Sequence, residues 1–269
     1  MRKPLTIILL FVSIMVYSQK QTNDYSELFL DSIFQKNTGT FVLYDLQNNN
    51  YQVYEPERAK QKFAVHSTSK ILWSIIGLEE GLINSDSDIV KWDSVKYPPK
   101  QWWPDGFKQD QTIVSALNKS VNWYYFELLK LMTPEMIEKY LNELDYQKDY
   151  HVEKVHYFGL TFTIKKSAFE QIDFLKGIYL NKFNLSAKTL NAVKKGMLYS
   201  SNPGCAVYTK TGTGPIANDN GIGWLIGWIE KSPKTYFFAF NVEDADEINA
   251  GKLRYEYGFK VLKAMNLLK

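Results

Sequence analysis

The sequence has few of the residues that build metal sites and disulfides. Cys205 is its only cysteine, so no internal disulfide can form. The three histidines, His66, His151 and His156, do not stand at a spacing typical of zinc ligands. We therefore expect no metal site and no bound cofactor, so any chemistry must come from the remaining side chains.

The chain also has no large excess of charge of either sign. Lys and Arg number 32 against 29 Asp and Glu, a formal net charge of +3. No basic run occurs, and nucleic-acid-binding domains carry clustered positive charge, so we expect no nucleic-acid partner. Hydrophobic residues make up 45% and charged residues 23%, which excludes disorder, collagen and coiled coil for the chain as a whole. Aromatic residues, at 15%, suffice to fill a core and line a cleft.

No hydrophobic run has the roughly 20 apolar residues that a bilayer span needs. The apolar stretch Leu5–Val16 has 12 residues; it follows Arg2-Lys3 and precedes Tyr17-Ser18. A basic start, a short apolar run and small exit residues predict a signal peptide over residues 1–18, and hence an exported, periplasmic protein. No cysteine stands at the cleavage site, so we expect no stable membrane anchor. A buried N-terminal strand is the alternative interpretation of this stretch.

The order of the predicted elements indicates an α+β fold. The predicted strands cover residues 39–46, 51–54, 207–212, 221–229 and 235–242. The predicted helices cover residues 71–78, much of 110–147, 165–182, 186–198 and 250–268. Because both ends of the sequence supply strands, we predict an antiparallel central sheet with helices on both faces and an inserted helical sub-domain at about 85–200. Residues 19–269 then form a single domain.

Three short motifs follow one another along the chain: Ser67-Thr68-Ser69-Lys70, Ser120-Val121-Asn122 and Lys210-Thr211-Gly212. Each is weak when taken alone, because such patterns occur by chance in many chains. Their order and contexts make the set more specific. The first motif opens the apolar helix at 71–78, and the second falls on a helical segment. The third lies on the strand at 207–212, the first of a meander of three strands that continues with 221–229 and 235–242.

Ser67 and Lys70 have the spacing of a nucleophile and its base. Positions i and i+3 share one face of a helix, so Lys70 lies one turn from Ser67. A serine hydroxyl needs an adjacent base, and a lysine can act as one only when burial lowers its pKa from about 10.4. His66 directly precedes Ser67, but its side chain is expected to point away from the Ser67 face, so we assign it no catalytic role.

Together these motifs resemble those of the penicillin-recognising serine enzymes, and specifically the class D (oxacillinase-type) β-lactamases. The similarity extends from about residue 30 to the end of the chain. The matching stretches are Gly39–Asp45, Glu57–Ala59, Ser67–Ile71, Ile76–Ile83, Trp92-Asp93, Ser120–Tyr125, Gln171–Leu175, Lys210–Thr213, Gly223–Trp228 and Tyr236–Asn241. The resemblance implies a β-lactamase/transpeptidase-like fold and a β-lactam as the small-molecule partner.

The resemblance also implies a role for each residue of the first two motifs. Ser67 would be the acylated nucleophile. Lys70 would be carboxylated by carbon dioxide to N6-carboxylysine and would act as general base, so carbon dioxide or bicarbonate is the one accessory molecule expected. Ser120 would relay a proton to the lactam nitrogen.

The third motif and the last helix would bind the substrate. Lys210 would supply positive potential, and Thr211 and Gly212 would line the site beside it. The backbone N–H groups of Ser67 and Thr213 would form the oxyanion hole. Arg254 occupies the position whose guanidinium binds the substrate carboxylate in the family, and a bidentate fork suits that anion. A solvated helix charge is the alternative interpretation of this arginine.

The sequence departs from the class D pattern at several positions. Asn122 stands where an aliphatic residue is usual, and Ser69 where an aromatic one is usual. Tyr157-Phe158-Gly159 is the nearest match to the family's Tyr-Gly-Asn box, and the segment from there to Ser167 is shorter than usual. The tryptophan that hydrogen-bonds the lysine carbamate in the family has no counterpart. All these departures affect deacylation, whereas the acylation set is complete.

We therefore weigh three hypotheses. The first, which we favour, is an exported class D-like serine β-lactamase. The second is a penicillin-binding or sensor-like domain that is acylated but deacylates poorly; a membrane sensor would need transmembrane spans, which the sequence does not show. The third is a non-catalytic envelope-binding protein, against which the presence of Ser67, Lys70, Ser120 and Lys210 argues.

Overall fold

The fold was analysed in a computed structural model that describes residues 27–216 and 220–268. The predicted signal peptide, residues 1–18, lies outside the described residues. The helices are α1 (Glu27–Phe34), α2 (Pro56–Lys60), α3 (Lys70–Glu79), α4 (Ile113–Lys119), α5 (Asn122–Lys130), α6 (Pro134–Glu143), α7 (Tyr157–Thr163), α8 (Ala168–Tyr179), α9 (Ala187–Met197) and α10 (Glu247–Ala264), with 3₁₀ turns η1 (His66–Ser69) and η2 (Asp105–Phe107). The strands are β1 (Gly39–Asp45), β2 (Asn50–Tyr54), β3 (Phe63–Ala64), β4 (Lys165–Lys166), β5 (Leu198–Asn202), β6 (Cys205–Pro215), β7 (Gly221–Lys231) and β8 (Lys234–Asp244).

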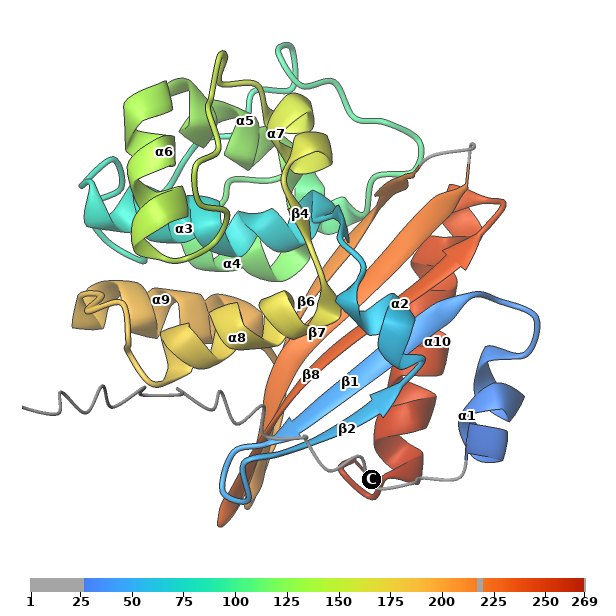
Figure 1. Cartoon of the computed structure of the whole chain (residues 1–269). Helices are drawn as coiled ribbons and strands as arrows, with labels where there is room; N and C mark the ends of the chain where they lie inside the picture. Colours follow the sequence, from blue (N-terminus) through green and yellow to red (C-terminus); the bar gives the residue numbers. More distant parts are fainter. Residues whose placement is uncertain (1–26, 217–219, 269) are drawn as a thin grey trace, which may run out of the picture.

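Six of the strands form one antiparallel sheet in the order β2-β1-β8-β7-β6-β5 (Figure 1). The hairpin β1–β2, from the N-terminal part of the chain, pairs with β8 of the C-terminal meander in the register Gly39↔Val242 to Asp45↔Tyr236. The predicted meeting of the two ends of the sequence in one antiparallel sheet is confirmed. Strand β5 was not predicted, because its residues are mostly exposed and show no apolar alternation.

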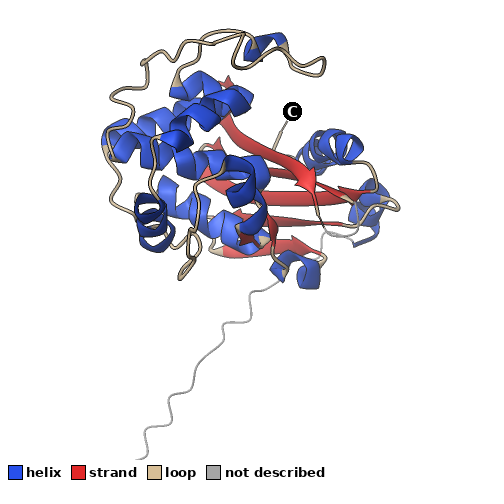
Figure 2. Cartoon of the chain, turned by 90° about the horizontal axis from the view of Figure 1, so that it is seen from above, coloured by secondary structure: helices blue, strands red, loops and turns tan. Residues whose placement is uncertain are grey.

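Helices cover both faces of this sheet, as predicted (Figure 2). Alternate side chains of one strand point to opposite faces, so Phe41 and Leu43 of β1 pack in the apolar cluster with α1 and α10. Val42 and Tyr44 of the same strand pack in the larger cluster on the other face, with the helical part of the chain. The catalytic motifs all lie on this second side.

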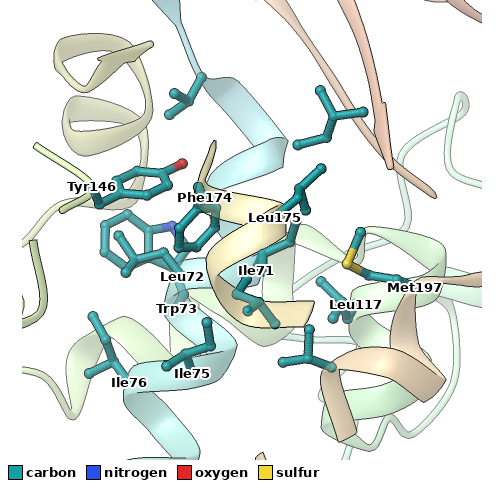
Figure 3. Packing of buried hydrophobic residues seen from close by; sticks show 14 of the residues in the cluster. Ile71, Leu72, Trp73, Ile75, Ile76, Leu117, Tyr146, Phe174, Leu175 and Met197 are labelled. Carbon is teal, nitrogen blue, oxygen red and sulfur yellow. The ribbon is translucent and has the colours of Figure 1, made fainter. Parts of the chain in front are cut away.

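Helix α3 is the centre of the larger cluster. Its residues from Lys70 to Leu78 are all buried, because apolar side chains occur around its whole circumference. Figure 3 shows Ile71, Leu72 and Trp73 of α3 among side chains from several other helices. The helix ends as predicted near Gly81, which adopts a left-handed φ of 68°.

The structure corrects the prediction for the Ser120 motif. Ser120 does not lie within a helix but in the turn between α4 and α5, where it adopts a left-handed φ of 62°. The last helix also begins earlier than predicted, at Glu247, after the side chain of Asp246 caps its first turn. None of the helices in the described residues combines the length and the apolar composition of a bilayer span.

Candidate active site

Ser67 and Lys70 lie at the buried start of α3. The 3₁₀ turn η1 leads directly into the helix, so the two side chains project to the same side. Lys70 Nζ lies 2.9 Å from Ser67 Oγ. The turn is fixed by the Ser69 hydroxyl, which donates to the His66 carbonyl oxygen at 2.6 Å and accepts from Trp73 Nε1 at 2.9 Å. The predicted nucleophile and base are therefore in direct contact.

The second motif approaches Lys70 from the turn between α4 and α5. Lys70 Nζ lies 3.2 Å from Ser120 Oγ and 2.7 Å from Asn122 Oδ1. The left-handed conformation of Ser120 turns the chain sharply enough to present both side chains to the same amine. Asn122 thus takes a place in the site that the sequence pattern of the family would give to an aliphatic side chain.

Lys210 reaches the same point from strand β6. Its Nζ lies 2.9 Å from Ser120 Oγ and 2.9 Å from the Thr211 carbonyl oxygen. Ser120 Oγ therefore accepts from two amines, and its own hydroxyl hydrogen stays available for a further acceptor. Of the predicted catalytic residues, Ser67, Lys70, Ser120 and Lys210 are all brought together, although up to 143 positions separate them in the sequence.

Burial controls the charge of the two lysines. Desolvation lowers the pKa of Lys70 well below its usual value, and the nearby Lys210 and Arg254 lower it further. Desolvation and Arg254 likewise lower the pKa of Lys210 well below the usual range. Within the described ranges, no carboxylate forms an ion pair with any of these three residues. The site therefore has an excess of positive potential and an amine that can exist uncharged.

Arg254 lies beside the third motif. Its Nη1 donates to the Gly212 carbonyl oxygen at 3.0 Å, whereas its Nε is buried without a hydrogen-bond partner in the described part of the chain. Gly251, one helical turn earlier on α10, packs against Thr213. The guanidinium therefore has donors to spare next to Thr213, as the predicted carboxylate-binding role requires.

Gly212 allows β6 to pass very close to the nucleophile. A Cβ built on Gly212 would lie 2.9 Å from the Val65 carbonyl oxygen and 3.4 Å from the Ser67 backbone nitrogen. The backbone of β6 thus runs beside the Ser67 N–H, and Thr213 follows directly. This is the arrangement in which two backbone donors can converge on one oxygen.

Ser67 and Asn122 open into a cleft of about 590 Å³ that is lined largely by aromatic rings. His66 also lines it, with its ring against Phe162 at 5.4 Å, so the expectation that His66 points away from the site was wrong. Its imidazole is buried, and burial lowers its pKa to about 4, so it is neutral at physiological pH. Tyr157, which the sequence analysis noted only in the nearest match to the family's Tyr-Gly-Asn box, also lines the cleft.

The segment between residues 96 and 103 forms much of one wall of the cleft, and sequence reasoning assigned it no role. It contains Pro98-Pro99 and Trp102-Trp103, and these rings line the cleft. A run of prolines and aromatic residues in a segment without helix or strand was the available signal. The described residues contain no cluster of His, Cys, Asp and Glu that could hold a metal ion.

The sequence profile of the penicillin-binding protein transpeptidase domain matches residues 33–263 of the chain. Two kinds of curated relatives are similar at nearly equal identity. The methicillin resistance mecR1 protein of Staphylococcus aureus is 29% identical over 230 residues, which are 86% of this chain and 38% of that protein. The probable beta-lactamase YbxI of Bacillus subtilis is 30% identical over 220 residues, 82% of this chain and 80% of that protein. The chain thus spans about two fifths of the length of the mecR1 relative.

Solved structures show the same two kinds of similarity. A class D β-lactamase from Sebaldella termitidis has a TM-score of 0.81 and 28% identity, covering 90% of this chain and 97% of its own. The C-terminal domain of the Bacillus licheniformis BlaR penicillin-receptor has a TM-score of 0.79 and 27% identity, covering 89% and 96%. Because the profile match covers most of the chain, the chain belongs to the penicillin binding protein transpeptidase domain family, and class D β-lactamases are among its homologues.

Proposed function

We propose that the protein is an exported serine β-lactamase that opens the lactam amide through an acyl-Ser67 intermediate. The observation that carries the proposal is the 2.9 Å contact between Ser67 Oγ and a buried amine, Lys70 Nζ, whose pKa burial lowers. An uncharged lysine amine has two N–H donors and one lone pair. It can therefore donate to Ser120 and Asn122 while its lone pair accepts the Ser67 hydroxyl hydrogen.

Acylation follows from these contacts. Ser67 Oγ attacks the lactam carbonyl carbon and transfers its proton to Lys70 Nζ, while the Ser67 and Thr213 N–H groups stabilise the oxyanion. The carbon–nitrogen bond of the ring then breaks, and the nitrogen takes the Ser120 hydroxyl proton, which Lys70 replaces. Arg254 and Lys210 bind the substrate carboxylate. A water molecule then attacks the ester carbonyl carbon and gives a proton to the base at Lys70; the bond from that carbon to Ser67 Oγ breaks, and the proton passes to Ser67 Oγ.

Carboxylation of Lys70 is part of the proposal, and the surrounding residues fit such a group. Addition of carbon dioxide needs an uncharged amine, which the buried Lys70 supplies. The Tyr157 ring lies 5.2 Å from Lys70 Nζ, and its phenolic oxygen is buried without a hydrogen-bond partner among the described residues. In the carboxylated form a carboxyl oxygen, in place of Nζ, would take the proton of Ser67 in acylation and that of the water in deacylation. Tyr157, and Asn122 with its amide turned over, could donate to it.

A second candidate function is a penicillin receptor that is acylated and stays so. The observation that favours it is the 2.7 Å contact of Lys70 Nζ with Asn122 Oδ1, because an amide oxygen stabilises an N–H donor and disfavours the carbamate. Relatives with sensor names, mecR1 and BlaR, are as similar as the β-lactamases. Both candidates share acylation of Ser67 and differ only in deacylation.

Intact-protein mass spectrometry with a penicillin over time separates the two. A β-lactamase shows product formation in excess of protein with a transient adduct, whereas a receptor shows one stable adduct per chain. The Ser67→Ala variant should show no adduct, because Ser67 is the attacking group, whereas the Ser120 hydroxyl, the other one in contact with Lys70 Nζ, serves as the proton donor to the lactam nitrogen. A stoichiometric adduct on that variant, or no adduct and no turnover in the parent, would refute the assignment.

A further inference from the structure

The segment from Lys91 to Trp103 contains no helix or strand, and its part from Lys96 to Trp103 forms one wall of the cleft. We propose that Glu127 is a positioning residue that holds this 91–103 segment as a preformed wall for the large substituents of a β-lactam. The inference rests on the proposed function and names the part of the substrate that this wall serves. Glu127 itself does not line the cleft.

Glu127 gathers three donors on one carboxylate, and two of them come from the wall. Tyr97 Oη donates to Glu127 Oε1 in a short bond, and Lys96 Nζ lies 2.9 Å from the same oxygen. Lys130, one turn further along α5, lies 2.8 Å from it and 3.2 Å from Tyr97 Oη. Burial alone would raise the pKa of Glu127, but the bonds from Lys130, Tyr97 and Lys96 outweigh it and lower that pKa to about 2. The carboxylate therefore stays charged throughout the physiological range.

Among the described residues, the other polar attachments of the segment to the rest of the fold lie at its base, on Asp110. Trp92 donates its backbone N–H to Asp110 Oδ1 at 2.9 Å, and Lys91 Nζ lies 2.9 Å from Asp110 Oδ2. The 3.2 Å bond from Trp92 Nε1 to the Tyr97 carbonyl oxygen is internal to the segment.

The middle of the segment, by contrast, is joined to the rest of the fold through Glu127, through Lys130 and through the ring of Tyr97, which lies 6.1 Å from the Trp123 ring and 6.2 Å from the Phe126 ring. Its end is held separately by Trp103, which is buried with its ring 5.8 Å from that of Phe107. Loss of the carboxylate would thus loosen the middle of the wall, around Lys96 and Tyr97.

Glu127 and the catalytic partner of Lys70 stand on the same helix. Asn122 is the first residue of α5, and Glu127 follows a little more than one turn later. Because the wall is attached to the helix that also carries Asn122, its position relative to Lys70 and Ser67 is fixed. Trp102 is 63% exposed in the wall, so it offers a ring face to a substituent that extends beyond the lactam nucleus.

The test compares a bare nucleus with a bulky substrate. 6-Aminopenicillanic acid has no acyl side chain, whereas a chromogenic cephalosporin with aryl groups on both sides of its nucleus reaches the wall. Glu127→Ala should lower the second-order acylation rate for the bulky compound by about three- to tenfold and leave that for the bare nucleus nearly unchanged. Tyr97→Phe keeps the ring but removes one of the two bonds from the wall to Glu127, since Lys96 stays paired, and should give a smaller loss of the same kind; the double variant should be no worse than Glu127→Ala.

Glu80→Ala is the matched control. Glu80 forms a similar partly exposed pair with Lys139 at 2.8 Å, away from the cleft, and its loss should change neither rate. Amide hydrogen exchange over residues 92–103 should quicken in Glu127→Ala but not in Glu80→Ala. Equal effects on both compounds, or unchanged exchange, would overturn the inference. A parent that neither compound acylates would refute the proposed function, and hydrogen exchange would then decide on the positioning role alone.

Discussion

The surroundings of two buried lysines, Lys70 and Lys166, differ in a way that separates chemistry from structure. Both side chains are almost wholly inaccessible, and burial lowers both pKa values. Lys70 contacts two hydroxyl groups and an amide, and further cations lie nearby. Lys166 donates to the Tyr146 carbonyl oxygen and lies over the Tyr146 ring at 4.4 Å.

The neighbours decide what each amine can do. The carboxylate of Glu170 raises the pKa of Lys166 and partly offsets burial, which leaves it at about 8. Lys70 has no such carboxylate, so its amine loses its proton more readily. The Ser67 hydroxyl lies within hydrogen-bond distance of the uncharged amine and can donate its proton to it. Burial of a lysine is thus not itself a sign of catalysis. The sign of catalysis is the combination of burial, a missing counter-charge and a hydroxyl group within hydrogen-bond distance.

The largest expected effect comes from removing Lys70, and the removal of Lys166 is its comparison. Lys70→Ala should slow the acylation of Ser67 by a penicillin about a hundred- to ten-thousandfold, the usual contribution of a general base. Lys166→Met should leave that rate close to that of the parent, because Lys166 touches no group of the site. Stopped-flow kinetics or timed mass spectrometry measures both. Equal losses in the two variants would show that the comparison is wrong.

The pH dependence of stability should distinguish Lys166 from its neighbour. The pKa of Lys166 is about 8 in the fold against 10.5 for an ordinary lysine, so the unfolded chain binds more protons between these values. Stability contributed by this group therefore rises with pH from about 8 to 10.5, by about 3 kcal/mol in total. Lys166→Met should remove this rise in urea unfolding curves, whereas Lys165→Met, next to it and exposed, should keep it. A rise that persists in Lys166→Met would assign it to another group.

Removal of the cation beside Lys70 should have a smaller effect. Arg254→Ala deletes the guanidinium that donates to Gly212 and retains unpartnered donors near Thr213. Capture of penicillins should weaken by about 1.5–3 kcal/mol, the range for a charge-assisted hydrogen bond. The expected change is in the second-order acylation rate for carboxylate-bearing substrates. Unchanged kinetics would place the anion site elsewhere.

The smallest effect is expected from replacing Asn122. The response of turnover to added bicarbonate tests whether Asn122 hinders or supports deacylation, the step in which the two candidate functions differ. The Asn122 amide oxygen lies 2.7 Å from Lys70 Nζ and disfavours the carbamate. Added bicarbonate should then raise the turnover of the parent a few-fold by favouring carboxylation of the amine, and Asn122→Val should reduce that dependence. Steady-state turnover with and without bicarbonate measures this. A fast parent that shows no burst and no response to bicarbonate would mean that Asn122 supports deacylation.

Much of the site could be predicted because its residues lie in short local patterns. The spacing of Ser67 and Lys70 places them on one side of any helical turn, and the structure has them in contact. The strands with alternating apolar residues and the apolar helix α3 could also be predicted, since each shows in the pattern of apolar residues along the sequence. Strand β5 and the cleft wall at 96–103 were missed, because neither shows such a period.

The tertiary structure alone decided how these patterns combine. Lys210 meets Ser120 across 90 positions, and Arg254 meets Gly212 across 42, through the pairing of β6 with β7 and the packing of α10. The state of the Lys70 amine likewise depends on burial and on charges from distant parts of the chain. The sequence by itself determined which groups could react, because it specifies the chemistry of each side chain and the spacing of neighbouring residues. The fold determined which of them do so, because distance, desolvation and charge depend on three-dimensional neighbours.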